Sequence, residues 1–140
     1  MRIVLCGGYS FAEPFILQHP DDALTWIDPD PMHCEHIHTI YEIQTLCADP
    51  LSPGALALAG VEACDLFVSL LPCERDNLTL CQRAMEHFHV KATIALAQDD
   101  YQVAVLREWG VSQVLLAPRI LADSLTEAIS RTVACGQDAK

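Results

Sequence analysis

The sequence predicts an α/β fold of three layers: a Rossmann-like sheet of six parallel strands in the order 3-2-1-4-5-6, with helices on both faces. Two observations carry this prediction. Short apolar runs alternate with stretches of helical character, which is typical of a parallel sheet covered on both faces. The chain also opens on an apolar strand, a glycine turn, a helix and a second apolar strand that ends in an acid, Asp28.

The first half of the chain supplies three strands and three helices. Residues 2–6 are apolar and run into the glycine turn, so we expect a strand there and a helix over 11–19. Residues 23–28 form the second apolar run. Pro31 and Pro53 favour helix starts, because the missing N–H of proline costs little in a first turn. The remaining elements are expected at 31–38 (helix), 43–48 (strand) and 53–59 (helix).

The second half continues the alternation. Apolar runs predict strands, and the stretches between them predict helices. Gly60 and Gly110 stand just past expected helix ends, where a left-handed cap is favoured, and Pro118 stands near a helix start. We expect strands at 65–71, 92–97 and 113–117 and helices at 75–88, 100–109 and 119–134. Residues 1–140 are therefore expected to form a single domain.

Composition narrows the class of function. Eight Lys plus Arg against nineteen Asp plus Glu give a formal net charge of −11, which disfavours binding to nucleic acid or to an anionic membrane. No apolar run approaches the roughly 20 residues that cross a bilayer, so we expect a cytoplasmic protein without membrane insertion. Seven scattered cysteines favour reduced thiols in a reducing compartment over a disulfide framework.

The glycine turn matches most of a dinucleotide-binding motif. Against G-x-G-x-x-G, the chain supplies Gly7, then Tyr9 at the second glycine position, then Ala12, a small residue that the pattern allows. Glycine lets the backbone approach a pyrophosphate, the helix start offers N–H groups, and Asp28 would receive ribose hydroxyls. Alternatively, Asp28, Asp30 and Asp49 are turn-forming residues beside proline.

Tyr9 leaves three interpretations open. Its side chain projects where a pyrophosphate would approach the backbone, which disfavours ordinary NAD binding. Gly8 could provide another close approach, with Tyr9 stacking on a base or donating to a phosphate. Equally, Tyr9 fills the ligand space and the module binds no nucleotide. Glu13 in the first turn of the helix also repels an anion.

Three segments together resemble a known family. They are Ala59-Gly60-Val61-Glu62-Ala63-Cys64-Asp65, Glu74-Arg75-Asp76-Asn77-Leu78, and Trp109 to Val114 continuing to Ala117-Pro118-Arg119. In this order and spacing, over about residues 1–130, they resemble the nucleotide-binding domain of Trk and Kef type potassium-transport regulators, the RCK (KTN, TrkA-N) family. An acid that the family carries after its third strand matches Asp49.

The resemblance implies a cytoplasmic, non-catalytic gating module that binds NAD(H) or an adenine nucleotide (ATP, ADP or AMP). A separate transporter or channel chain at the inner face of the membrane would be its partner. Gly7, Gly8 and Ala12, with Tyr9 and Ser10, would form the phosphate loop. Asp28 would take the ribose, Asp49 would sit near the adenine, and Asn77 would face the ligand.

Alternative functions are a protein-interaction module without nucleotide and, less favoured, a fragment of an NAD-dependent oxidoreductase. Neither a Tyr-x-x-x-Lys pair nor a comparable acid/base set stands near the strand ends, so we expect no enzyme. A phosphorylated receiver domain would need paired acids where the chain has Gly7 and Gly8.

Two further patterns suggest partners. Between His33 and His38, the pairs His33/His36 and Cys34/His38 could each form half a metal site, although histidines on a short surface helix are usually solvated, and we expect no metal. The last helix carries an apolar stripe that predicts either a homodimer face or a cover for the sheet: Ile120, Leu121, Leu125, Ile129 and Val133.

Overall fold

The computed structural model describes residues 1–138 and contains a six-stranded parallel sheet in the order β3-β2-β1-β4-β5-β6. This confirms the predicted fold class and strand order. The strand positions also agree with the prediction to within one or two residues. They are β1 (Arg2–Gly7), β2 (Ala23–Asp28), β3 (Gln44–Cys47), β4 (Leu66–Leu70), β5 (Thr93–Ala97) and β6 (Gln113–Leu116).

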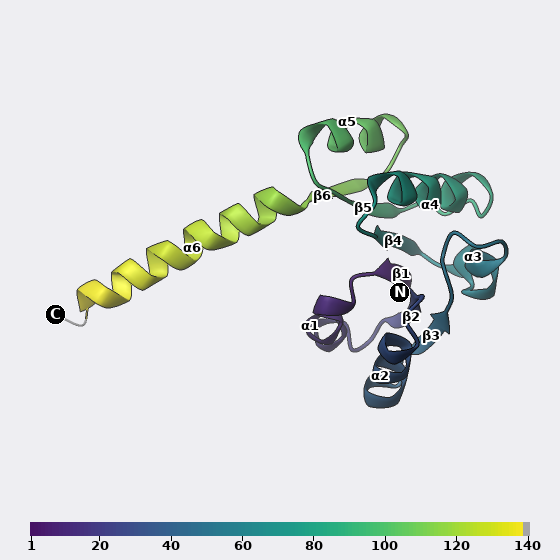
Figure 1. Ribbon diagram of the computed structural model, residues 1–140, viewed down its shortest axis with the longest axis horizontal. Coiled ribbons are helices and arrows are strands. Elements are labelled where there is room, and N and C mark those ends of the chain that lie inside the picture. Colours follow the sequence, from purple (N-terminus) through teal and green to yellow (C-terminus); the bar gives the residue numbers. More distant parts are fainter. Residues whose placement is uncertain (139–140) are drawn as a thin grey trace.

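Helices connect the strands in sequence order (Figure 1). They are η1 (Tyr9–Phe11, a 3-10 turn), α1 (Ala12–Gln18), α2 (Pro31–Tyr41), α3 (Ala55–Leu58), η2 (Val61–Ala63, 3-10), α4 (Glu74–Glu86), α5 (Asp100–Glu108) and α6 (Ala117–Asp138). Whether the whole of 1–140 folds as one independent domain stays a prediction, and its last two residues lie outside the described range.

Helices pack against both faces of the sheet through two clusters of apolar side chains. On one face, β1, β2 and β4 pack against α1 and α2 through residues such as Leu5, Trp26 and Ile37. On the other face, β1, β4, β5 and β6 pack against α3, α4 and α5 through residues such as Phe67 and Leu80. Burial on both faces explains why the strands read as continuous apolar runs.

Local signals set several helix boundaries. The Asp30 side chain accepts from the Met32 N–H at 2.9 Å and so caps α2, with Pro31 at its first position. Gly60 and Gly110 are left-handed, with φ of 78° and 94°, as the caps predicted. The expected helix 53–59 is shorter than predicted, because Gly54 is also left-handed and delays the start of α3 to Ala55.

The last helix leaves the body of the molecule instead of packing on it. Figure 1 shows α6 extending away from the sheet, starting where β6 ends. Its apolar stripe is exposed, with Ile120, Leu121, Leu125, Ile129 and Val133 between 51% and 72% accessible. The interpretation that this stripe covers the chain's own sheet is therefore wrong. Among residues 1–138, no helix has both the length and the hydropathy to cross a membrane.

All seven cysteines lie within the described residues 1–138, where each is a free thiol. Cys6, Cys34 and Cys81 are buried, as expected for small core residues, whereas Cys47, Cys73 and Cys135 are exposed. Burial raises the pKa of Cys81 to about 12 and also raises the pKa of Cys6, which keeps both in the unreactive thiol form.

Candidate functional site

The predicted binding residues gather at one edge of the sheet. Parallel strands present their carboxyl ends at a common edge, and ligands of open α/β sheets bind there. Gly7, at the end of β1, pairs with Leu70 of β4, and Asp28, at the end of β2, pairs with Cys47 of β3. Asp49 follows β3 by two residues. The chain therefore brings the glycine turn and both acids to the same edge.

The turn after β1 consists of two consecutive left-handed glycines, Gly7 (φ 81°) and Gly8 (φ 77°). Residues with a side chain rarely adopt this conformation. A Cβ on Gly7 would also stand 2.9 Å from the Leu70 carbonyl oxygen, and a Cβ on Gly8 would meet the Phe11 ring at 2.5 Å. Glycine is therefore required at both positions for β1 to run close to β4 and turn into η1.

Trp26 supports the glycine turn through a hydrogen bond. It lies on β2, is fully buried, and donates its indole N–H to the Gly7 carbonyl oxygen at 2.9 Å. Its ring meets Phe15 of α1 edge-on, with 6.1 Å between ring centroids. One side chain thus ties β2, the glycine turn and α1 together.

Asp28 is the buried acid of the site, with only 6% of its surface accessible. One carboxylate oxygen accepts from the Asp30 N–H at 2.8 Å, and the other lies 3.0 Å from Nδ1 of His33. Its backbone carbonyl accepts from the Cys34 thiol at 3.2 Å. Both carboxylate oxygens are therefore engaged within the chain.

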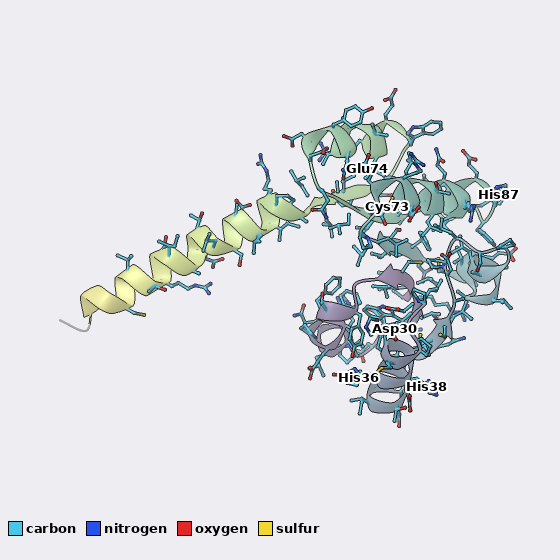
Figure 2. All side chains as sticks on the ribbon, viewed as in Figure 1. Asp30, His36, His38, Cys73, Glu74 and His87 are labelled. Atoms are coloured by element: carbon cyan, nitrogen blue, oxygen red, sulfur yellow. The ribbon has the colours of Figure 1, made fainter. Side chains whose placement is uncertain are left out.

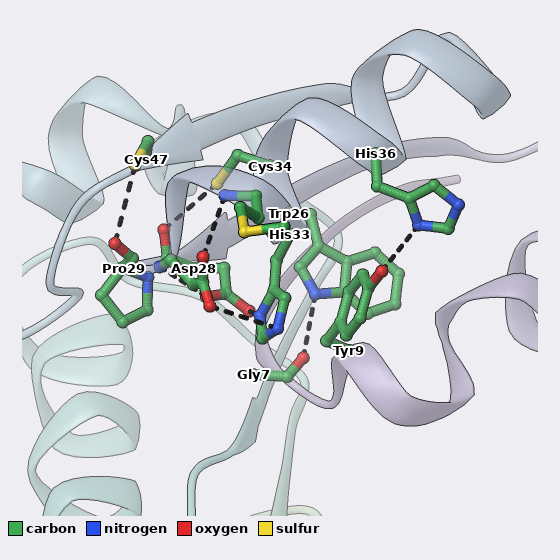
Figure 3. A network of polar contacts seen from close by, with 11 residues as sticks. Gly7, Tyr9, Trp26, Asp28, Pro29, His33, Cys34, His36 and Cys47 are labelled. Carbon is green, nitrogen blue, oxygen red and sulfur yellow. Dashed lines mark hydrogen bonds and ion pairs between the residues drawn. The ribbon is translucent and has the colours of Figure 1, made fainter.

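Tyr9 lies over this acid, with His33 between them (Figure 3). The Tyr9 and His33 rings stack with centroids 3.8 Å apart and planes 6° from parallel. The Tyr9 hydroxyl shares a hydrogen bond of 2.7 Å with Nδ1 of His36. Nε2 of His33 lies 3.4 Å from a carboxylate oxygen of Asp30. Tyr9 thus turns toward α2 and covers the outer side of His33.

A hollow remains on the α1 side of Tyr9. It measures about 190 Å³ and is lined by Tyr9, Ser10, Ala12, Glu13, Pro14, His36 and Tyr41. Pockets for small ligands typically hold about 300–1,000 Å³. Burial, and then the neighbouring Glu13 carboxylate, raise the pKa of Tyr41. The hollow is therefore acidic and smaller than a nucleotide needs.

The other predicted residues differ in their surroundings. Ser10 is exposed and Ala12 is buried against the sheet. Asp49 is exposed, and its side chain accepts from the Leu51 N–H at 2.9 Å, which is the turn chemistry weighed as the alternative. Asp30 acts similarly as the cap of α2.

Asn77 is buried in α4, and its amide bonds only to protein groups. Its oxygen accepts from the Ser69 hydroxyl at 2.7 Å and the Leu71 N–H at 2.9 Å. Its nitrogen donates to the carbonyls of Leu71 at 2.9 Å and Leu96 at 3.2 Å. Asn77 therefore ties the ends of β4 and β5 to α4, a structural role that the sequence did not indicate.

The histidine segment does not converge on one point. His33 turns to Asp28 and Asp30, His36 to Tyr9, and His38 to the Ile43 carbonyl at 3.2 Å. Figure 2 shows His36 and His38 on α2, far from His87 at the end of α4. Within residues 1–138, no three His, Cys, Asp or Glu side chains are arranged to hold a metal ion.

Sequence reasoning missed two contributors, His33 and Trp26. The sequence suggests for His33 only half of a metal site or a solvated surface position. The signal that could have found it is its position three residues after Asp30, the helix cap, which places its ring above the first turn. No such signal marks Trp26, because a tryptophan in an apolar strand is expected to be an ordinary core residue.

Comparisons with known proteins identify a family. The model of the TrkA-N domain family matches residues 3–117. The Trk system potassium uptake protein TrkA of Azorhizobium caulinodans is 22% identical over 130 residues, which cover 86% of this chain and 28% of that protein. The chain thus spans less than a third of that relative.

Solved structures share the fold. The TrkA-N domain of the inner membrane protein ybaL from Escherichia coli superposes with a TM-score of 0.79 at 20% identity, covering 91% of this chain and 95% of that one. The Kef C-terminal domain of Shewanella denitrificans, in an AMP-bound form, gives 0.77 at 17% identity, covering 94% and 82%. The GsuK channel bound to NAD gives 0.75 at 20%, covering 86% and 22%.

The family match covers most of the chain, and it includes the glycine turn, Asp28, the first two segments that resembled potassium-transport regulators and the third as far as Ala117. The chain therefore belongs to the TrkA-N domain family.

Proposed function

We propose that this chain is a regulatory, non-catalytic module that binds an adenine nucleotide or NAD(H) and passes the bound state to a potassium transporter or channel. The observation that carries the proposal is Asp28, buried at the end of β2 beside the Gly7–Gly8 turn. An acid at this place accepts ribose hydroxyls in dinucleotide-binding sheets. Structural neighbours whose names include AMP and NAD support this ligand class.

Each residue at the edge has a role in this proposal. Gly7 and Gly8 let a phosphate approach the backbone, and the first turn after them, with Ser10, offers N–H groups. Ala12 keeps α1 close to the sheet, since it is buried. Asp49 lies near the adenine. Asn77 contributes indirectly, because its bonds to the Leu71 backbone position the loop after β4.

The first test is binding by the wild type and the Asp28→Asn variant, with NAD, NADH, ATP, ADP and AMP as probes. A ligand at about 100 times its dissociation constant stabilises the fold by about 2.7 kcal/mol. We expect thermal-shift and calorimetric titrations to show this gain for one probe in the wild type. Asp28→Asn should lose it, because the amide replaces one of the two accepting oxygens of the carboxylate with an NH2 donor.

Asp21→Asn is the matched control, since Asp21 is exposed and precedes the start of β2, at the other end of the strand from Asp28. It should bind the probe as the wild type does. Equal binding by Asp28→Asn would contradict the ribose role.

A second candidate is a module that binds no nucleotide and acts through protein contacts alone. The stack of Tyr9 on His33 above Asp28 favours it, because these rings cover the acid. In this case no probe stabilises the wild type, and only a variant that opens the site, such as Tyr9→Gly, responds.

We also propose that α6 joins two copies of the chain as a homodimer. Its apolar stripe is unpartnered, and a second apolar area lies beside its origin. Ile94, Leu96 and Leu115 point to the same face of β5 and β6; Ile94 and Leu96 are partly buried, and Leu115 is exposed. A second copy that offers its own α6 can cover this face while its sheet receives the first α6.

The variant Leu121→Glu/Leu125→Glu tests this interface. Two buried charges without partners oppose association, so we expect light scattering to give half the wild-type mass. Asp123→Asn changes a side chain that lies about 200° around the helix from both Leu121 and Leu125, and it should keep the dimer. A wild type that is monomeric at all concentrations would contradict the interface.

A further inference from the structure

His33 occupies the place from which a ligand must reach Asp28. The Asp30 N–H holds one oxygen of the Asp28 carboxylate at 2.8 Å, and His33 lies 3.0 Å from the other. Only 6% of Asp28 is accessible, and Tyr9 stacks on the imidazole. A ribose diol can therefore bind Asp28 only after the His33 ring has moved.

The geometry around His33 suits the protonated ring. Nδ1 faces Asp28 at 3.0 Å, and Nε2 faces Asp30 at 3.4 Å. An ionised carboxylate only accepts hydrogen bonds, and a neutral imidazole has a single N–H. One ring nitrogen of neutral His33 would therefore turn its lone pair toward a carboxylate. Protonation gives both nitrogens an N–H and makes both contacts attractive.

We propose that His33, covered by Tyr9, is an internal competitor for the nucleotide: protonated, it closes Asp28, and on losing its proton it yields Asp28 to the ribose. This inference rests on the proposed function and adds regulation by protonation to the same site. Histidine is the side chain that gains or loses a proton within roughly pH 5–8. Ligand binding then releases a proton, and by linkage a lower pH weakens binding.

Other titratable groups lie around this pair. His36 shares the 2.7 Å hydrogen bond with the Tyr9 hydroxyl, and this bond persists in either protonation state because a hydroxyl both donates and accepts. Glu13 and Tyr41 line the hollow beside Tyr9. Among the thiols, Cys34 donates to the Asp28 carbonyl and Cys47 to the Pro29 carbonyl. Within residues 1–138, none of these groups hydrogen-bonds to the Asp28 carboxylate, whose partners are the Asp30 N–H and His33.

The experiment measures the affinity for NAD at about pH 6 and about pH 8, because the pyrophosphate of NAD keeps its charge over this range. We expect the wild type to bind roughly tenfold more weakly at the lower pH. His33→Ala should bind more tightly than the wild type at the lower pH and depend little on pH. Alanine favours the helix, so this variant is expected to fold.

His38→Gln is the matched control, because His38 lies on the same helix and contacts the Ile43 carbonyl instead of the acid. It should keep the wild-type dependence on pH. A second readout is the proton NMR signal of the His33 ring, which the stacked Tyr9 ring shifts upfield. NAD should return this signal to the ordinary histidine range and leave that of His38 in place.

The outcomes separate the two proposals. If the wild type binds NAD and His33→Ala shows the same affinity and pH dependence, the competitor role is wrong and the proposed function stands. Binding by His33→Ala alone supports the competitor role. If neither protein binds NAD at either pH, and no probe binds in the titrations described above, the nucleotide function fails together with the inference.

Discussion

Replacing Asn77 with alanine is expected to lower the free energy of unfolding by about 3–5 kcal/mol, because the change leaves several buried polar groups without a partner. The Asn77 amide forms hydrogen bonds with the Ser69 hydroxyl, with the N–H and the carbonyl of Leu71, and with the Leu96 carbonyl. Asn77 is 1% accessible, so water does not replace these bonds. Each unsatisfied buried group costs about 1–3 kcal/mol.

Urea unfolding of the wild type and the variant measures this loss. Gln102→Ala is the matched control, since the Gln102 amide oxygen accepts from the Gln98 N–H at 2.7 Å at an exposed place. It should cost no more than about 1 kcal/mol. A similar loss of unfolding free energy in both variants would contradict the expectation that burial makes the hydrogen bonds of Asn77 costly to remove. The loop after β4 should also lose protection from hydrogen exchange in Asn77→Ala.

Trp26→Ala is expected to destabilise the fold by about 3–5 kcal/mol, because it removes the largest fully buried side chain of the α1–α2 face. The change also removes the donor to the Gly7 carbonyl. We therefore expect weaker nucleotide binding as well as lower stability, since the glycine turn loses its support. Urea unfolding and titration with NAD or AMP measure the two effects.

Two further variants bound these effects. Trp26→Phe keeps a six-membered ring but loses the indole donor and part of the buried volume, so it should cost less than Trp26→Ala while still loosening the turn. Trp109→Ala changes a tryptophan that is 53% accessible and should have a small effect. If Trp26→Phe unfolds like the wild type, the bond to Gly7 contributes nothing measurable.

The strand order followed from the sequence because each strand is an apolar run and each connection is long enough for a helical crossover. Gly60 and Gly110 also marked their turns, since a left-handed residue after a helix has few substitutes. The position of α6 could not be predicted. An amphipathic stripe shows which side of a helix is apolar and leaves open whether that side meets its own sheet or another molecule.

The residues of the candidate site also divide into those whose position the sequence predicts and those whose position it does not. Gly7 and Asp28 were found because their positions relative to the first two strands are set by the backbone. Asn77 and His33 depend on where side chains from separate elements meet, which spacing along the chain does not determine. The alternating acids and prolines of residues 28–31 are equally typical of a turn. In the structure, Asp30 accepts from the Met32 N–H and caps α2.

The projecting α6 also gives the module a mechanical property. A helix of 22 residues spans about 33 Å, so a tilt of roughly 10° at its base displaces its far end by about 6 Å. The base follows directly from β6, in the same sheet as the strand ends that carry Gly7 and Asp28. A small rotation of the sheet would therefore produce a much larger displacement at the far end of α6.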